Sequence, residues 1–225
     1  MEILYEDDAI LVVRKDAGIA TETARIGQKD MVSLLKNYRV KKHEEPFIGL
    51  VHRLDQPVEG ILLIAKTSEA AATLSKSLKE HDIEKQYYAI ICGTPTEDGE
   101  FTDYIKFDKR TNVSSVTSKD DSDGKEAKLS YKVLENLTIE GENCTLLLVT
   151  LYTGRHHQIR VQFSAHGYPL YADRKYGTAK EGFDVALCSC ALSFAHPVNS
   201  RIMDFSITPV GKAFMPCEYF SKMIK

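Results

Sequence analysis

The sequence predicts an α+β fold, built as a single strand-rich domain with a mixed sheet and a few helices. Three observations lead to this prediction. Most apolar segments are only long enough for single strands, few segments have helical spacing, and no internal repeat or linker divides the 225 residues. Because 43% of the residues are apolar, the chain can bury a full core without a covalent staple.

Alternating apolar residues and a turn predict the first elements. Apolar segments at Ile3–Tyr5 and Ala9–Arg14 are separated by the turn-forming residues 6–8, which predicts a β-hairpin. A glycine-containing loop over Asp16–Thr23 follows it. Residues Met31–Tyr38 carry apolar side chains at the spacing of one helical face, so we expect a helix there.

A polar loop between two buried strands is the next predicted feature. Phe47–Val51 and Ile61–Ala65 are short and strongly apolar, which is typical of strands in the core of a sheet. They flank the polar stretch His52–Gly60, which we therefore expect on a loop. Beyond it, Thr67 or Ser68 caps a predicted helix that runs to about position 81.

The rest of the chain is predicted to be mainly strands with one further helix. Strands are expected at Tyr87–Cys92, Gly99–Phe107, Ala127–Leu134, Cys144–Tyr152 and, as the last strand, Leu187–Phe194. The polar segment Asp108–Lys125 is expected to be a mobile surface loop or a long hairpin. A helix is expected over His156–His166, beginning at Thr153–Arg155 and ending at Gly167, and the tail after Pro209 has modest helical character.

Composition excludes several classes of protein. The five cysteines, an odd number without a Cys-x-x-Cys pair, predict buried reduced thiols and neither a disulfide framework nor a zinc site. Acids precede the first apolar run, unlike in a secretory signal, and no apolar stretch approaches the ~20 residues of a membrane-spanning helix. We therefore expect a soluble, cytoplasmic protein without membrane partner, metal or cofactor.

The charge distribution restricts how the chain can bind nucleic acid. A net charge of −3 counts against a protein that coats nucleic acid by bulk electrostatics. An enzyme that grips one nucleotide needs only a local positive surface, so RNA is not excluded. Such clusters are more often solvated surfaces than binding sites. The two candidate basic edges are Lys36, Arg39, Lys41, Lys42 and His43, and Arg155, His156, His157, Arg160, Arg174 and Lys175.

The loop HRLDQPVEG at 52–60 places an imidazole, a guanidinium and a carboxylate within four residues. A carboxylate between two buried strands is costly to leave unpaired. Asp55 is therefore either tied into a structural ion pair with Arg53 or another cation, or held ionised and partly dry as a nucleophile. Pro57 and Gly60 fix the shape of the loop under both interpretations.

A second candidate site is LYTGRHHQIR at 151–160, where a strand runs through Gly154 into a predicted helix. Amide groups at a helix start attract anions, and Arg155 and Arg160 add donors for a phosphate or the RNA backbone. The alternative is that both arginines satisfy buried acids and carbonyl groups. The neighbouring His156 and His157 diverge on a helix, which disfavours a metal site.

The strand EKQYYAIICG is the third segment with candidate functional side chains. Tyr87 and Tyr88 point to opposite faces of this strand because side chains alternate along it. Tyrosines on strands usually serve in packing, and from the strand alone both are assigned to the core.

Taken in order, these segments resemble the RluA-type pseudouridine synthases over about Ile3 to Pro209. The matching segments are HRLD at 52–55 with Gly60 and ILLIAK after it, K-x-Y-x-A-x-x-x-G at 85–93, TGRHHQIR at 153–160, GYPLYADRKYG at 167–177 and LCSCALSFAHP at 187–197. The resemblance implies the pseudouridine synthase fold, with a mixed, largely antiparallel central sheet flanked by helices. It implies one catalytic domain over 1–225, without a separate N-terminal RNA-binding domain.

The resemblance also implies the chemistry. Asp55 would be the catalytic carboxylate, Tyr87 would pack against the target base, and Arg160 would pair with the aspartate and keep it ionised. Arg53 would replace the flipped uridine in the RNA stack. Further substrate-binding residues would be His52, Arg155, His157 and Gln158. The expected partner is ribosomal or transfer RNA, bound by a monomer.

Two departures and two rival functions accompany this expectation. Many relatives have Thr-Ser where this chain has Val58-Glu59, and TGR is more often followed by threonine than by His156. These changes affect the expected substrate more than the expected activity. The rivals are a non-catalytic RNA-binding protein that retains the fold, and a hydrolase with Asp55 as nucleophile and Glu59 as second acid.

Overall fold

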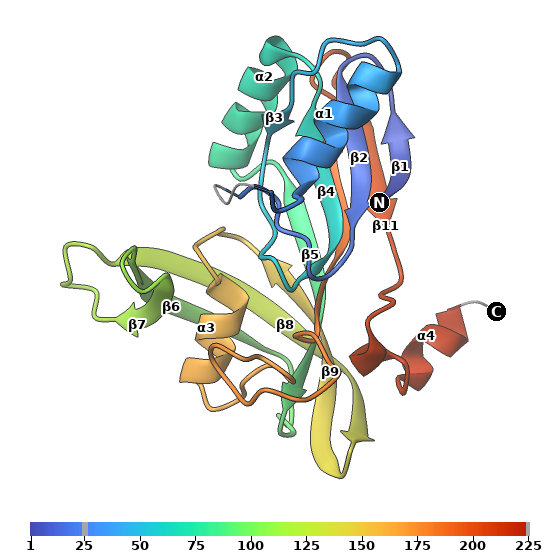
Figure 1. Ribbon diagram of the computed structural model, residues 1–225. Coiled ribbons are helices and arrows are strands. Elements are labelled where there is room, and N and C mark those ends of the chain that lie inside the picture. The colour runs from blue at the N-terminus through green and yellow to red at the C-terminus, as the bar shows by residue number, and fades with distance from the viewer. Residues whose placement is uncertain (24–26, 224–225) are drawn as a thin grey trace. The chain divides into compact units, whose positions relative to one another are not determined.

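The computed structural model describes residues 1–23 and 27–223 and divides into two compact units (Figure 1). The first unit contains Met1–Glu84 and Ser189–Ile207, and the second contains Lys85–Cys188 and Thr208–Lys225. Both combine strands with helices, so the predicted α+β class with a mixed, largely antiparallel sheet is confirmed. The assignment of 1–225 to one catalytic domain stays a prediction.

The first unit is a sheet with two helices. Its strands follow the order β1-β2-β4-β10, with β11 paired to β10 and β3 paired to β4. The elements are β1 (Glu2–Glu6), β2 (Ile10–Lys15), α1 (Met31–Lys41), β3 (Gly49–Leu50), β4 (Glu59–Ala65), α2 (Ser68–Lys79), β10 (Leu187–Ala195) and β11 (Ile202–Ser206).

The register between β2 and β4 explains how the first unit buries its core. Ile10 pairs with Ala65 and Val12 with Leu63, which places these four side chains on one face of the sheet. Ala70 and Leu74 of α2 belong to the same buried cluster. Both helices have the N-caps that their sequences favour, because Asp30 accepts a hydrogen bond from Ser33 N and Thr67 accepts one from Ala70 N.

The second unit is an antiparallel sheet in the order β5-β9-β8-β6-β7. The elements are β5 (Glu84–Cys92), β6 (Gly99–Asp108), β7 (Val113–Thr117), β8 (Lys125–Ile139), β9 (Glu142–Leu151), α3 (Gln158–Ala165), the 3₁₀ turn η1 (Lys212–Phe214) and α4 (Glu218–Met223). Phe163 of α3 packs edge-on against Phe101 of β6, and Phe220 of α4 packs edge-on against Tyr88 of β5. These aromatic contacts hold the two helices against the sheet.

The polar segment Asp108–Lys125 contains strand β7, which pairs with β6, so it forms a hairpin, one of the two alternatives expected for it. Three expectations about the elements require correction. Leu187–Phe194 is not the last strand, because β11 follows it; β11 alternates between exposed and half-buried residues and so lacks an apolar run. Residues Glu59 and Gly60 lie in β4 and not in the loop. The third helix begins at Gln158, later than expected.

Two further findings concern the thiols and the helices. All five cysteines are free thiols, and four of them are buried. In the described part of the chain, no helix is long and apolar enough to cross a membrane.

Candidate functional site

The predicted site residues lie on two sets of elements. His52, Arg53 and Asp55 lie on the loop that precedes β4 in the first unit. Tyr87 lies on β5 in the second unit, which also carries the segment from Arg155 to Arg160 at the start of α3. The pairing of Asp55 with Arg160 stays a prediction.

Thr21 holds the loop that carries Asp55 in place by hydrogen bonds. Its buried hydroxyl donates to Leu54 O at 2.8 Å and accepts from Leu54 N at 3.1 Å. Both backbone groups of the residue preceding Asp55 are thus bound by one side chain. Asp55 itself is half-buried, and its backbone carbonyl accepts from Val58 N at 3.1 Å, which closes a turn through Pro57. The backbone that carries the carboxylate is therefore fixed on both sides of Asp55.

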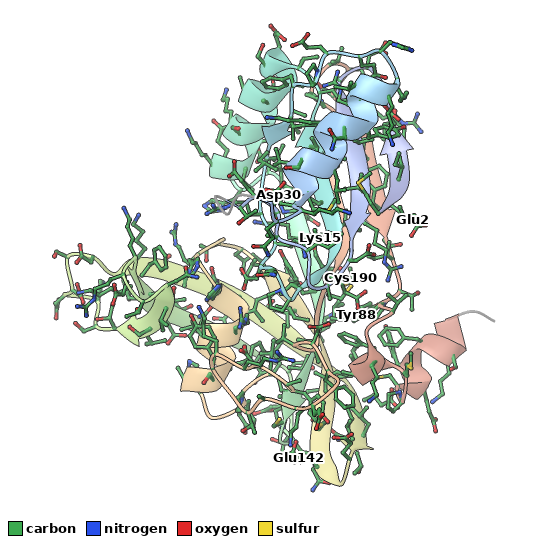
Figure 2. All side chains as sticks on the ribbon, viewed as in Figure 1. Glu2, Lys15, Asp30, Tyr88, Glu142 and Cys190 are labelled. Atoms are coloured by element: carbon green, nitrogen blue, oxygen red, sulfur yellow. The ribbon has the colours of Figure 1, made fainter. Side chains whose placement is uncertain are left out.

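Lys15 joins this loop to the preceding one. Lys15 lies at the end of β2 (Figure 2). Its side chain is fully buried, and Nζ donates to the carbonyl groups of Asp16, Ile19 and Gln56 at 3.0, 2.6 and 3.1 Å. An ammonium group has three N–H donors, so these carbonyl groups offset the cost of burying the charge. Gly18 N also donates to Gln56 O at 2.9 Å, so hydrogen bonds hold the two loops together.

His52 and Arg53 differ in their surroundings. His52 is half-buried and accepts a hydrogen bond at Nε2 from Leu63 N of β4 at 3.1 Å, so a proton on the neutral ring sits on Nδ1. Arg53 is exposed, and its guanidinium makes no hydrogen bond or ion pair with the described residues. Of the two, Arg53 has the side chain that is available to a ligand.

The two residues that begin β4 have structural roles. Glu59 is buried and forms a salt bridge with Arg14 of β2 at 3.1 Å. Gly60 has a φ of +137°, and a Cβ there would lie 2.5 Å from the backbone of Ser189 on β10. Only glycine permits this approach, which brings the start of β4 against β10.

On β5 the two neighbouring tyrosines face opposite ways. Tyr88 packs edge-on against Tyr219 and Phe220, with ring centroids 6.1 and 4.9 Å apart, and so belongs to the packing around α4. Tyr87 pairs with Val149 of β9 in register and shares its face of the strand with Lys85. Tyr88 therefore serves in packing, and the role of Tyr87 at the target base stays a prediction.

The segment before α3 folds onto the side chain of Gln158. Its Oε1 accepts from Thr153 Oγ1 at 2.8 Å and from Arg155 N at 2.9 Å, while Nε2 donates to Lys128 O at 3.2 Å. His157 precedes the helix with a φ of +55°. The amide of Arg155 is thus occupied, which corrects the expectation of a helix start with open amides at Thr153–Arg155.

The two arginines of this segment bind protein groups. Arg160 makes a bidentate salt bridge with the fully buried Asp173, from Nε to Oδ2 and from Nη2 to Oδ1, both at 2.8 Å. Burial would raise the pKa of Asp173, but Arg160 and the amides of Lys175 and Tyr176 hold it below its usual range. Arg155 Nε donates to Glu126 O at 2.7 Å. Arg160 thus binds a buried acid and Arg155 a carbonyl group, as expected if these arginines serve the protein structure and not a phosphate.

Two stacked imidazoles connect α3 with the β6–β7 hairpin. The rings of His156 and His157 stack at 3.6 Å between centroids. Ser114 Oγ hydrogen-bonds His156 Nδ1 at 2.9 Å, and Tyr176 Oη hydrogen-bonds His157 Nδ1 at 2.7 Å. Ser114 N also donates to Tyr176 Oη at 2.9 Å. His156, the departure from the usual motif, therefore has a local role in fixing the hairpin.

Two of the five residues in the basic edge around α1, Arg39 and Lys42, are committed to contacts within the protein, while Lys36, Lys41 and His43 are exposed. Arg39 Nη1 donates to Phe47 O and Lys66 O at 2.5 and 2.8 Å. Lys42 forms salt bridges with Glu6 and Glu44 at 2.8 and 3.2 Å. No cluster of histidine, cysteine and acidic side chains among residues 1–23 and 27–223 has the arrangement of a metal site.

Sequence reasoning missed Thr21, Lys15, Asp173 and Tyr176. Asp173 and Tyr176 lie within the matched segment GYPLYADRKYG, which was a usable signal. Thr21 and Lys15 stand in an ordinary loop and at the end of a strand, and their contacts with the loop at 52–58 join residues far apart in the chain.

Comparison with known proteins decides the family. Residues 9–165 match the family described as RNA pseudouridylate synthase. The chain belongs to this family. Ribosomal large subunit pseudouridine synthase C of Rickettsia bellii is 36% identical over 179 residues, covering 79% of this chain and 57% of that protein. Ribosomal large subunit pseudouridine synthase D of Zymomonas mobilis is 32% identical over 223 residues, covering 91% of this chain and 68% of that protein.

Solved structures show the pseudouridine synthase fold. Human RNA Pseudouridylate Synthase Domain Containing 1 matches with a TM-score of 0.76 and 24% identity, covering 92% of this chain and 83% of that one. Human RNA Pseudouridylate Synthase Domain Containing 4 matches with a TM-score of 0.75 and 19% identity, covering 93% and 89%. The pseudouridine synthase fold expected from the sequence motifs is thereby confirmed. The chain spans from 57% to 68% of the length of the two bacterial synthases.

Proposed function

We propose that the protein isomerises a specific uridine in RNA to pseudouridine, with Asp55 as its catalytic carboxylate. Membership of the RNA pseudouridylate synthase family supports the reaction class. The single observation that carries the residue assignment is the anchoring of the Asp55 loop by Thr21 and Lys15. Such anchoring is what a catalytic group needs, because a displacement of about 1 Å can cost about 100-fold in rate.

The reaction is an isomerisation in which no atom is gained or lost. The bond from uracil N1 to the ribose C1′ breaks, a bond from C5 to C1′ forms, and the proton on C5 leaves while N1 gains one. The carboxylate of Asp55 acts on the sugar carbon, on the base or on a sugar proton. The base must be kept in the site and water excluded until it is rejoined, in contrast with glycoside hydrolysis.

In this proposal Arg160 pairs with Asp55 and keeps it ionised, while Asp173 orients Arg160. Asp173 binds Nε and Nη2 of the guanidinium. A planar guanidinium held from one edge presents its remaining donors in a fixed direction. Tyr87 packs against the uracil ring from the face of β5 opposite to Tyr88.

The remaining predicted substrate contacts divide by their surroundings. Arg53 has an exposed guanidinium that is available to fill the gap left by the flipped uridine. His52, Arg155, His157 and Gln158 all make contacts within the protein, so their proposed role is to shape the surface on which the RNA lies. The names of the bacterial relatives favour large-subunit ribosomal RNA as the substrate. We place the reaction in the cytoplasm and the enzyme in a monomeric state.

The two rival functions receive less support. A hydrolase would need Glu59 as a second acid, but Glu59 is buried in a salt bridge with Arg14. A non-catalytic RNA-binding protein would have no use for a pinned carboxylate loop, and Asp55, Tyr87 and Arg160 are all present.

Pseudouridine mapping on RNA from source cells tests the proposed function. Cells with and without the gene are compared, and the deletion strain is rescued with the wild type or with Asp55→Asn. We expect one or a few sites to vanish on deletion and to return only with the wild type. Unchanged maps, or rescue by Asp55→Asn, would contradict the proposal.

A further inference from the structure

A buried lysine on β5 has no polar partner among residues 1–23 and 27–223. Lys85 is only 7% exposed, and its ammonium makes no hydrogen bond or ion pair with any of the described residues. Lys15, the other deeply buried lysine considered above, donates to three carbonyl groups. Burying an ammonium group without such partners is costly, so the position of Lys85 requires a separate explanation.

The surroundings of Lys85 point to a ligand. Lys85 lies two residues before Tyr87 and shares its face of the strand. Its Nζ lies beside Gly154, where a Cβ would be 3.6 Å away, so the absence of a side chain at 154 leaves that side of the amine unobstructed. Among the described residues, only two fully enclosed side-chain atoms lack a hydrogen-bond partner, Ser189 Oγ and Gln162 Oε1. Lys85 Nζ also lacks such a partner but is not one of these two atoms, so it keeps a small solvent-accessible surface.

We infer that Lys85 binds a phosphate group of the RNA beside the target uridine. An anion offsets the burial of an ammonium better than a neutral acceptor does, and the anionic groups of RNA are its phosphodiesters. The inference rests on the proposed function, because it takes RNA as the ligand. It adds Lys85, with Gly154 as its open flank, as a substrate-binding residue.

The pKa of Lys85 in the free protein reflects the same burial. Burial holds the pKa of Lys85 below its ordinary value, and no nearby acid counteracts this effect. The charge at this position therefore destabilises the ligand-free fold. A lysine retained only for stability would stabilise the ligand-free protein. The melting temperature of a Lys85 variant therefore distinguishes a binding role from a structural one.

The test compares Lys85→Met, Lys85→Arg and the control Lys132→Met. Lys132 is an exposed lysine on β8 of the same unit. Its replacement removes the same charge, but from the surface and not from a buried position. Each change is made in the Asp55→Asn protein to prevent turnover. Binding to an unmodified transcript of the organism's large-subunit ribosomal RNA is measured at several salt concentrations, together with the melting temperature.

We expect Lys85→Met to weaken RNA binding about ten-fold or more and to lower the slope of log K against log[salt] by about one unit. It should also melt at a higher temperature than its parent, while Lys85→Arg keeps the slope. RNA affinity equal to that of Lys132→Met would overturn the inference, as would a lower melting temperature. Pseudouridine formation by the wild type on the same transcript tests the proposed function independently of the inference about Lys85.

Discussion

Arg160 and Asp173 form a bidentate salt bridge in which both side chains are buried, with two N–O distances of 2.8 Å. Asp173 also accepts from the amides of Lys175 and Tyr176 at 2.9 and 3.1 Å, which fixes the carboxylate from a second side. The guanidinium is therefore oriented by the loop after α3 as well as by its own helix.

Replacing Asp173 with alanine should destabilise the protein strongly. Arg160 would keep its buried charge without this partner, a situation that costs about 3–5 kcal/mol. The free energy of unfolding in urea measures the loss, and turnover should fall with it. Asp184→Ala is the control, since Asp184 is exposed and its removal should change stability by less than about 0.5 kcal/mol. Equal stabilities for the two variants would show that Asp173 does not hold Arg160.

Thr21 should be needed for the position of Asp55. Thr21→Val keeps the shape of the side chain but leaves Leu54 N and Leu54 O without the hydroxyl, at a cost of about 1–3 kcal/mol. We expect a lower melting temperature and a lower kcat at saturating RNA. Thr21→Ser retains the hydroxyl and should stay close to the wild type in both measurements. If valine and serine behaved alike, the hydrogen bonds to Leu54 would not position the loop.

Two glycines should respond differently to alanine. Both have a positive φ, +85° at Gly18 and +137° at Gly60, but a Cβ at Gly18 meets nothing within 4 Å. Gly18→Ala should cost about 1–2 kcal/mol from backbone strain alone. Gly60→Ala adds a clash with the Ser189 backbone and should greatly reduce the yield of soluble protein. Thermal melts and expression yields compare them, and a well-folded Gly60→Ala would contradict the close approach of β4 to β10.

Glu6 should make the first unit sensitive to acid. Burial alone would raise the pKa of Glu6, but hydrogen bonds from Lys42, Lys66 and Tyr38 lower it to about 2. A carboxyl group whose pKa is depressed on folding contributes stability above its ordinary value of 4.5, and this stability is lost as the pH falls toward 2.

Urea unfolding of the wild type and Glu6→Gln at several pH values measures this contribution. The difference in stability should be constant above about pH 5 and should shrink steadily as the pH falls toward about 2. A difference that did not depend on pH would show that the hydrogen bonds to Glu6 do not favour its ionised form.

Local sequence signals predicted most of the elements. The capping residue Thr67 predicted a helix, and α2 begins directly after it. The apolar run at Ile61–Ala65 predicted a strand, and β4 contains it. Strand β11 was missed because an edge strand with exposed Ile202 has no apolar run to detect. The start of α3 was misplaced because Gln158 folds back onto Arg155, and propensity does not reveal that turn.

The site was predictable as a set of motifs, but not as a set of contacts. HRLD, the tyrosine at 87 and the arginine at 160 were found from residue type and order. The partners that hold them were not, because Thr21 reaches Leu54 across 33 residues and Arg160 reaches Asp173 across 13. Such pairings depend on tertiary structure, and no local pattern encodes them.

The most direct test of the central claim uses purified protein and an unmodified large-subunit ribosomal RNA transcript. Pseudouridine is mapped after incubation with the wild type or with Asp55→Asn, once equal melting temperatures and equal RNA binding have been verified. We predict that the wild type converts one or a few uridines, and that Asp55→Asn is slower by about a thousand-fold or more. Turnover by Asp55→Asn at the wild-type rate would contradict the assignment of Asp55 as the catalytic carboxylate.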